Sequence, residues 1–142
     1  MASVISFPFA RRPSRRFGLI RYPVASVEFW SRKFRRWIPV QAVVDTGADY
    51  TLLPRFFLQS LGAKGLGGGT TIPSKGIGGS ERVRFFPHWP LRLGPWNLSA
   101  PIGFLDRDDI PPLLGRMECL DRFQVTFRRQ RTAFAMLRSR IR

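Results

Sequence analysis

The 142-residue sequence has few of the residues that build disulfides, metal sites and membrane spans. It contains one cysteine, Cys119, and one histidine, His88, so it can form no intrachain disulfide and offers too few ligands for zinc. No apolar run approaches the roughly 20 residues that cross a bilayer. We therefore expect no metal, no cofactor and no membrane contact, with Cys119 buried and His88 at a surface turn or strand edge.

Acidic residues are also scarce, since nine Asp and Glu stand against 24 Lys and Arg and give a net charge of +15. The excess lies at the two ends: residues 1–36 hold nine basic residues against one acid, and residues 116–142 hold eight against two. No RGG repeat, zinc-finger spacing or aromatic RNA-binding motif accompanies this charge. Nucleic acid is therefore an unlikely specific partner, and only non-specific contact through the basic tails is expected.

The N-terminus places its short apolar part before its arginines and interrupts it with Pro8, unlike a secretory signal. Its Arg-rich, acid-free composition has some transit-peptide character, but a flexible basic arm over residues 1–18 is the simpler interpretation. The length suits one domain, which we place at residues 19–137, followed by a basic tail at 138–142. A cytoplasmic protein is the default expectation.

From Leu19 onward, short apolar runs alternate with turns, which predicts an all-β domain. One short helix is expected between Pro54 and Gly62, and the segment MECLDRF after Gly115 has room for another helical turn or two. The glycine-dense segment between Gly62 and Ser80 is too permissive in φ to be a rigid element, and we expect part of it to move. The predicted strands lie in residues 20–30, 37–45, 81–93 and 97–105, with turns at SRKFRR and GPW, and residues 124–137 are predicted to form a final two-strand hairpin.

The most informative stretch is VVDTGADYTLLP, residues 43–54, in which an apolar strand runs directly into Asp45. A carboxylate at such a place is costly unless it has a partner or opens into a cleft, so Asp45 is not an ordinary surface residue. The tripeptide Asp-Thr-Gly alone is a weak signal because it also forms ordinary turns. Two further segments follow it in the chain, SKGIGGS at residues 74–80 and PPLLGR at residues 111–116.

In this order, the three segments resemble the active-site turn, the flap and the apolar-apolar-Gly-Arg motif of the retropepsin-like aspartic proteases. The resemblance covers about residues 21–137 and implies an acid-protease barrel of a cellular or bacterial single-domain member. The family's chemistry needs two facing aspartates, yet the chain has one DTG and no second DTG or DSG. The resemblance therefore implies a homodimer in which each copy supplies one Asp45.

The resemblance also assigns roles to individual residues. Asp45 would activate water together with its symmetry mate, Thr46 would interlock the two active-site turns, and Gly47 would let the backbone approach substrate. Arg116 would form a bidentate ion pair with Asp49 behind the site, although an unrelated surface Asp and Arg would also fit the sequence. The residues expected to bind substrate are Ala48, Asp49, Gly76, Ile77, Gly78, Gly79, Ile110, Pro111 and Leu113, and those expected to support the site are Leu114, Gly115 and Arg116.

The function implied is an aspartic endopeptidase that cleaves protein or peptide substrates beside hydrophobic residues. We expect its dimer interface at residues 132–137, where TAFAML is apolar and suited to a strand. Two alternatives remain: a peptide-binding module of the same fold with little activity, and a basic nucleic-acid-associated protein. The glycine-rich stretch before the flap is longer than in a compact viral enzyme, so the resemblance does not determine the resting conformation of the flap.

Overall fold

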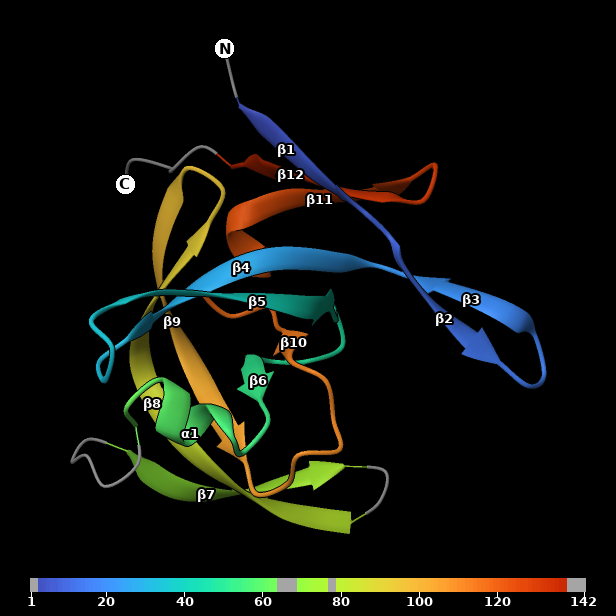
Figure 1. Ribbon diagram of the computed structural model, residues 1–142. Coiled ribbons are helices and arrows are strands. Elements are labelled where there is room, and N and C mark those ends of the chain that lie inside the picture. Colours follow the sequence, from blue (N-terminus) through green and yellow to red (C-terminus); the bar gives the residue numbers. More distant parts are fainter. Residues whose placement is uncertain (1–2, 64–68, 77–78, 138–142) are drawn as a thin grey trace.

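The computed structural model describes residues 3–63, 69–76 and 79–137, which form a β-barrel, a smaller sheet and a projecting hairpin (Figure 1). The largest sheet has the strand order β4-β5-β10-β6-β9-β8-β7, and β4 also pairs with β8. This extra pairing closes the sheet into a barrel and leaves β7 outside it as the partner of β8. The predicted all-β fold is confirmed.

The barrel strands form where apolar side chains alternate along the sequence. In β4, Val27 and Phe29 are fully buried, whereas Ser26 is exposed, as expected for a strand with one face on the core. Glu28 of β4 lies opposite Arg92 of β8 and forms an ion pair with it at 2.8 Å, at the closure of the barrel. The strands of this sheet are β4 (Val24–Ser31), β5 (Arg36–Val44), β6 (Thr51–Leu53), β7 (Thr70–Gly76), β8 (Gly79–Leu93), β9 (Trp96–Leu105) and β10 (Leu113–Leu114).

The barrel interior is aromatic. Trp89 is fully buried and packs edge-to-face on Phe104, with ring centroids 5.8 Å apart. Its indole N–H donates to the carbonyl oxygen of Trp30 at 2.9 Å, so the one polar atom of this side chain has a partner in the core. The helix expected between Pro54 and Gly62 is present as α1 (Phe57–Ser60), which buries Phe57 against the core.

A second sheet has the order β1-β12-β11 and is formed by the two ends of the chain. Its strands are β1 (Val4–Pro8), β11 (Phe123–Arg128) and β12 (Arg131–Met136), and the 3-10 helix η1 (Leu120–Arg122) leads into it. The predicted final hairpin is therefore confirmed. Because β12 pairs with β1 on one side and β11 on the other, it has no open edge with which to pair a second copy, and the dimer interface at residues 132–137 stays a prediction.

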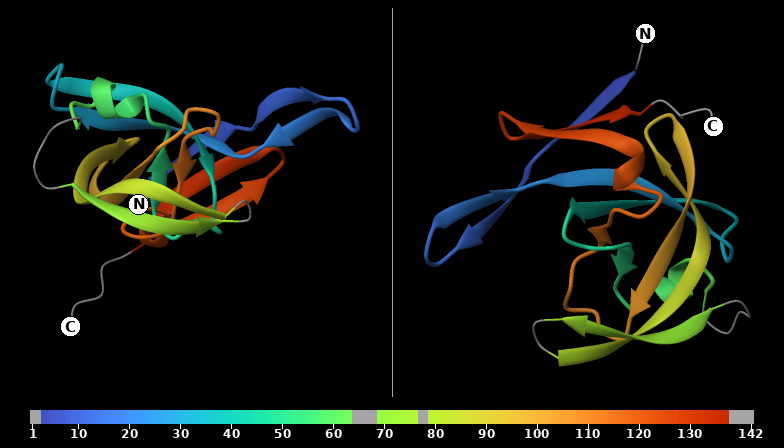
Figure 2. Two further views of the ribbon diagram at one scale, coloured as in Figure 1. Left: turned by 90° about the horizontal axis from the view of Figure 1, so that it is seen from below. Right: turned by 180° about the vertical axis from the view of Figure 1, so that it is seen from behind.

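The N-terminal segment also differs from its prediction as a flexible arm. Residues 4–8 form β1, in which Ile5 and Phe7 alternate with exposed residues and pack against the core. The arginines that follow this short strand led to its interpretation as part of a basic arm. Strands β2 (Ala10–Ser14) and β3 (Gly18–Tyr22) then form a two-stranded hairpin that projects away from the barrel (Figures 1 and 2). Among the described residues, no helix is long and apolar enough to cross a membrane.

Candidate active site

Strand β5 delivers Asp45 to a turn at its C-terminal end. Strand β10 runs parallel beside β5, with Leu114 opposite Val44, and the backbone N–H of Asp45 donates to the carbonyl oxygen of Leu114 at 3.0 Å. Two residues earlier on each segment, the N–H of Val43 donates to the carbonyl oxygen of Pro112 at 2.8 Å. The short β10 therefore holds the end of β5 and fixes where Asp45 leaves the sheet.

The carboxylate of Asp45 is oriented by its own turn. Its Oδ1 accepts the backbone N–H of Gly47 at 2.9 Å, and its carbonyl oxygen accepts the N–H of Ala48 at 3.2 Å. A Cβ atom at Gly47 would lie 3.2 Å from this Oδ1, so glycine leaves the carboxylate and the backbone free to approach each other. Asp45 is half-buried while Thr46 and Gly47 are exposed, so the turn is open to a ligand from outside.

Arg116 ties the far side of this turn to the segment after β10. One guanidinium nitrogen donates to Oδ1 of Asp49 at 2.6 Å and the other donates to the carbonyl oxygen of Thr46 at 3.2 Å. The pair of Arg116 with Asp49 is thus formed, but the expected bidentate contact is not: the guanidinium divides its donors between the carboxylate and the turn. Because both side chains are largely exposed, the ion pair adds little stability, and its effect is to hold the turn in shape.

Gly115 occupies a place that no larger residue fits. A Cβ atom there would lie 2.3 Å from the carbonyl carbon and oxygen of Tyr50, which are backbone atoms and have little freedom to move. The N–H of Gly115 donates to Oγ1 of Thr51 at 3.1 Å inside the core. This role of Thr51 was not predicted from the sequence, although a polar residue at the start of an apolar strand is a signal for a buried hydrogen bond, and Thr51 is fully buried.

Cys119 lies beside this hydrogen bond and is fully buried, as predicted. Burial raises the pKa of its thiol to about 12, and a hydrogen bond with Thr51 opposes this only in part. His88 is exposed within β8, next to a register shift between Phe86 and Trp89. Neither residue is in contact with the Asp45 turn in any recorded interaction, and we assign them no part in its chemistry.

The other residues expected at the site fall into two groups. Ile110 and Leu113 are half-buried and Pro111 is exposed on the segment leading into β10, whereas Leu114 is fully buried in the core. The expected flap is the hairpin of β7 and β8, whose last recorded pair is Gly76 with Gly79. The flap residues Ile77 and Gly78 lie outside the described residues.

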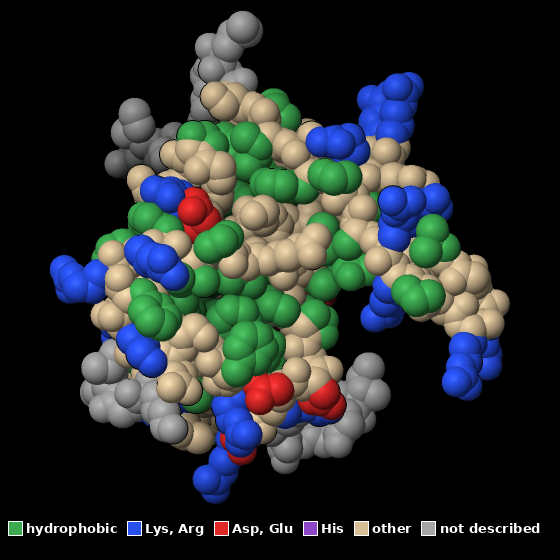
Figure 3. Space-filling model, in the orientation of Figure 1, with side chains coloured by type: hydrophobic (Ala, Val, Ile, Leu, Met, Phe, Trp, Pro, Cys, Tyr) green, Lys and Arg blue, Asp and Glu red, His purple; other side chains and the backbone are tan. Residues whose placement is uncertain are grey.

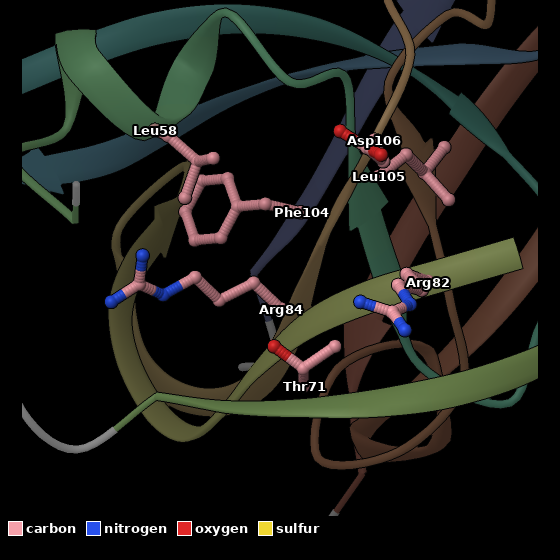
Figure 4. Close-up of a pocket in the computed structure, with 7 residues that line it drawn as sticks. All are labelled: Leu58, Thr71, Arg82, Arg84, Phe104, Leu105 and Asp106. Atoms are coloured by element: carbon pink, nitrogen blue, oxygen red, sulfur yellow. The ribbon is translucent and has the colours of Figure 1, made fainter. Parts of the chain in front are cut away.

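A hollow of about 220 Å³ lies at the base of the β7–β8 hairpin, between these two strands and the end of β9 (Figure 4). Arg82 and Arg84 of β8 extend along one side of it, and Phe104 and Leu58 form an apolar wall. The remaining lining residues are Thr71, Leu105 and Asp106. Asp45 is not among them, so this hollow is separate from the carboxylate that the turn presents.

Comparison with known proteins agrees with this arrangement. A family model described as aspartyl protease matches residues 37–117, a range that begins in β5, includes the Asp45 turn and the β7–β8 hairpin, and ends just after Arg116. The match covers more than half of the chain, and the chain therefore belongs to the aspartyl protease family, of the retropepsin-like type. A search of curated proteins found no match.

Proposed function

We propose that this protein is an aspartic endopeptidase whose active site forms when two copies bring their Asp45 residues together. The observation that carries the proposal is the turn after β5, in which a half-buried carboxylate is oriented by a backbone N–H and framed by β10. The membership of the aspartyl protease family supports the same chemistry. Among the described residues, no group of His, Cys, Asp and Glu is arranged to hold a metal ion, and the cysteine is buried.

The reaction follows from the shared proton of two close carboxylates. As is general for aspartic proteases, two carboxylates about 3 Å apart do not both ionise, so one is a base while the other is an acid. The ionised Asp45 takes a proton from a water, and the resulting nucleophile forms a C–O bond to the scissile carbonyl carbon. The protonated Asp45 donates its proton to the carbonyl oxygen. The Asp45 that took the water proton then passes it to the amide nitrogen while the other Asp45 takes a proton from a gem-diol hydroxyl, so the C–N bond breaks and the pair again holds one proton.

The second carboxylate has no good source within one copy. The acidic loop after β9 is the richest alternative, but its members already have partners: Asp106 pairs with Arg55 at 3.5 Å, and Asp108 accepts the N–H of Phe56 at 2.7 Å. Asp109 is paired with Arg107, and this hydrogen bond holds the pKa of Asp109 below its usual value. A symmetry-related Asp45 is the simplest partner, since one two-fold axis makes both halves of the site identical.

The proposed substrate is an extended peptide with hydrophobic side chains on either side of the cut bond. The flap hairpin of β7 and β8 could pair with such a peptide through its backbone, as an added strand. The half-buried Ile110 and Leu113 provide apolar surface near the turn. The same fold could instead hold peptides without efficient cleavage, and the experiment below distinguishes the two.

The test compares wild type with Asp45→Asn on an unfolded protein substrate such as reduced casein. We expect cleavage by the wild type, inhibition by a statine-type transition-state mimic and a bell-shaped pH profile, because the pair must carry one proton. The Asp45→Asn variant should fold normally and cleave nothing. Comparable cleavage by the variant would disprove the mechanism, and peptide binding without cleavage by wild type would identify a binding module.

A further inference from the structure

The hairpin of β2 and β3 carries an arrangement that the peptidase chemistry does not use. Arg11 lies directly opposite Arg21 across the two strands, and on the neighbouring sheet Arg128 lies opposite Arg131. Like charges in directly opposite positions destabilise a strand pair, and a two-stranded hairpin is only marginally stable to begin with. An anion bound between these strands would remove the repulsion.

An open hollow of about 480 Å³ lies between the β2–β3 hairpin and the β11–β12 turn, and we call it the arginine hollow. It is lined by Pro8, Phe9, Arg11, Arg21, Arg129, Gln130 and Arg131. Its volume is in the range that accommodates a small ligand or one segment of a longer chain. Four arginines and no acidic residue therefore line the same space.

The charges of the arginine hollow are not neutralised within the part of the chain that the structure describes. The ion pairs among the described residues involve other arginines, none of which lines the hollow: Arg55, Arg92, Arg107, Arg116 and Arg122. Arg131 instead donates to Oγ of Ser6 at 3.1 Å, which orients its side chain without cancelling its charge. Figure 3 shows blue side chains and no red ones on the projecting hairpin, which agrees with its lack of Asp and Glu.

The backbone at the edge of the hollow is held in an unusual conformation. Arg129 and Gln130 form the β11–β12 turn with φ of 51° and 59°, where glycine or asparagine would be less strained. The N–H of Phe9 donates to the carbonyl oxygen of Gln130 at 2.8 Å and ties this turn to the chain between β1 and β2. The turn is thus fixed so that Arg129 faces the same hollow as the hairpin arginines.

Exposed aromatic rings accompany the arginines. Phe9 packs edge-to-face on Phe127 at 6.5 Å, and the Phe127 side chain is 46% exposed. Phe17, in the turn between β2 and β3, is 72% exposed. It stands about 13 Å from the Arg11–Arg21 pair along the hairpin, since it is four residues from Arg21 and strands rise about 3.3 Å per residue. Cationic grooves with exposed rings suit single-stranded nucleic acid, because phosphates meet the guanidinium groups while bases stack on the rings.

We propose that the arginine hollow and the β2–β3 hairpin bind single-stranded nucleic acid through its phosphate backbone, without sequence preference. An acidic polypeptide would also meet the arginines but would leave the exposed rings without a partner, so nucleic acid fits the surface better. This site is separate from the proposed peptidase site and does not depend on it. It is built on paired strands, in contrast to the loose contact through basic tails that the composition alone predicts.

The test measures binding of a fluorescent oligothymidine of about 20 nucleotides by anisotropy, between about 50 and 200 mM salt. The variant Arg11→Gln/Arg21→Gln should bind about tenfold more weakly at low salt, and its log–log salt slope should fall by about 1.4 for two lost phosphate contacts. The control Lys33→Gln/Arg35→Gln removes the same charge from the β4–β5 turn, at the opposite end of the molecule (Figures 1 and 2). This control should keep wild-type affinity within about twofold.

Further variants separate the site from a general charge effect and from other ligands. Arg129→Gly removes one guanidinium while relaxing a positive φ, so it should fold well and still lower the affinity. Phe17→Ala should weaken oligothymidine binding at least about fivefold, the loss expected for one stacked base, and should leave polyglutamate binding unchanged. Equal weakening by both double variants would overturn the site. Polyglutamate binding as tight as oligothymidine, or full displacement by inorganic phosphate at equal ionic strength, would overturn nucleic acid as its ligand.

Discussion

The backbone N–H of Asp45 donates to the carbonyl oxygen of Leu114 at 3.0 Å, which joins the Asp45 turn to a strand much later in the chain. The next residue, Gly115, donates in turn to Thr51 on β6, and Arg116 reaches back to Asp49 and Thr46. The end of β10 and the segment after it therefore hold the Asp45 turn in place through hydrogen bonds.

Gly115→Ala should destabilise the protein strongly. The added methyl group would meet backbone atoms of Tyr50 at 2.3 Å, so the backbone segments around Gly115 and Tyr50 must move apart, at a cost of about 1–3 kcal/mol or more. Gly18→Ala is a suitable control, because its Cβ meets nothing within 4 Å and only its φ of 75° is unfavourable. Urea denaturation should show the larger loss for Gly115→Ala. An equal loss for both variants would mean that the close approach is not the cause.

Thr51→Val should lower the free energy of unfolding by about 1–3 kcal/mol, because it leaves the buried N–H of Gly115 without an acceptor. Thr132→Val provides a matched control: Thr132 is equally buried, but its hydroxyl has no recorded hydrogen-bond partner in the structure. That variant should be neutral or slightly stabilising. Denaturant melts of the two variants side by side decide the matter, and a similar effect of both would show that the Thr51 bond contributes nothing.

Arg116→Lys should reduce peptidase activity more than stability. Lysine keeps the charge but cannot donate to the Asp49 carboxylate and the Thr46 carbonyl with one planar group, so the turn loses its shape. We expect a loss of about tenfold in kcat and less than about 1 kcal/mol in stability. Arg122→Lys, in the exposed pair with Glu118 at 3.7 Å, serves as the control and should leave both unchanged. Unaltered kcat in Arg116→Lys would exclude this positioning role.

The proposed two-fold active site has a consequence for mixed dimers. If two copies are joined by a flexible linker and only one carries Asp45→Asn, activity should be almost abolished, since no complete carboxylate pair can form within the tethered dimer. The tethered wild-type pair should stay active on dilution, whereas the untethered protein should lose specific activity as dimers dissociate. Half activity in the mixed tethered dimer would show that each copy works alone.

The buried thiol of Cys119 predicts a loss of stability at alkaline pH. Its pKa is raised from 9.0 to about 12 in the folded protein, so the unfolded chain releases this proton first as the pH rises. The stabilisation is complete below about pH 9 and declines by about 1.4 kcal/mol per pH unit until the folded pKa is reached. Cys119→Ala should therefore lose less stability than wild type between pH 8 and 11, measured by denaturant melts. Parallel declines would indicate that Cys119 titrates normally.

Several features of this protein follow from its sequence because they depend on near neighbours. The alternation of Val27 and Phe29 with Ser26 marks β4, and Pro54 and Gly62 bound the segment that contains α1. The Asp-Thr-Gly turn is recognisable because its bonds join residues within three positions, such as Gly47 to Asp45. Such local patterns determined the all-β class, the family and the position of the candidate carboxylate.

Only the tertiary structure decided the contacts that join distant parts of the chain. The sequence does not reveal that β12 lies between β1 and β11, so that its edges are already paired, or that Thr51 accepts the N–H of Gly115. It also does not reveal that Arg11 and Arg129, far apart in the chain, line one hollow. These arrangements depend on strand order and register, which are set by the closure of the whole barrel and its attached sheets and have no signature in neighbouring residues.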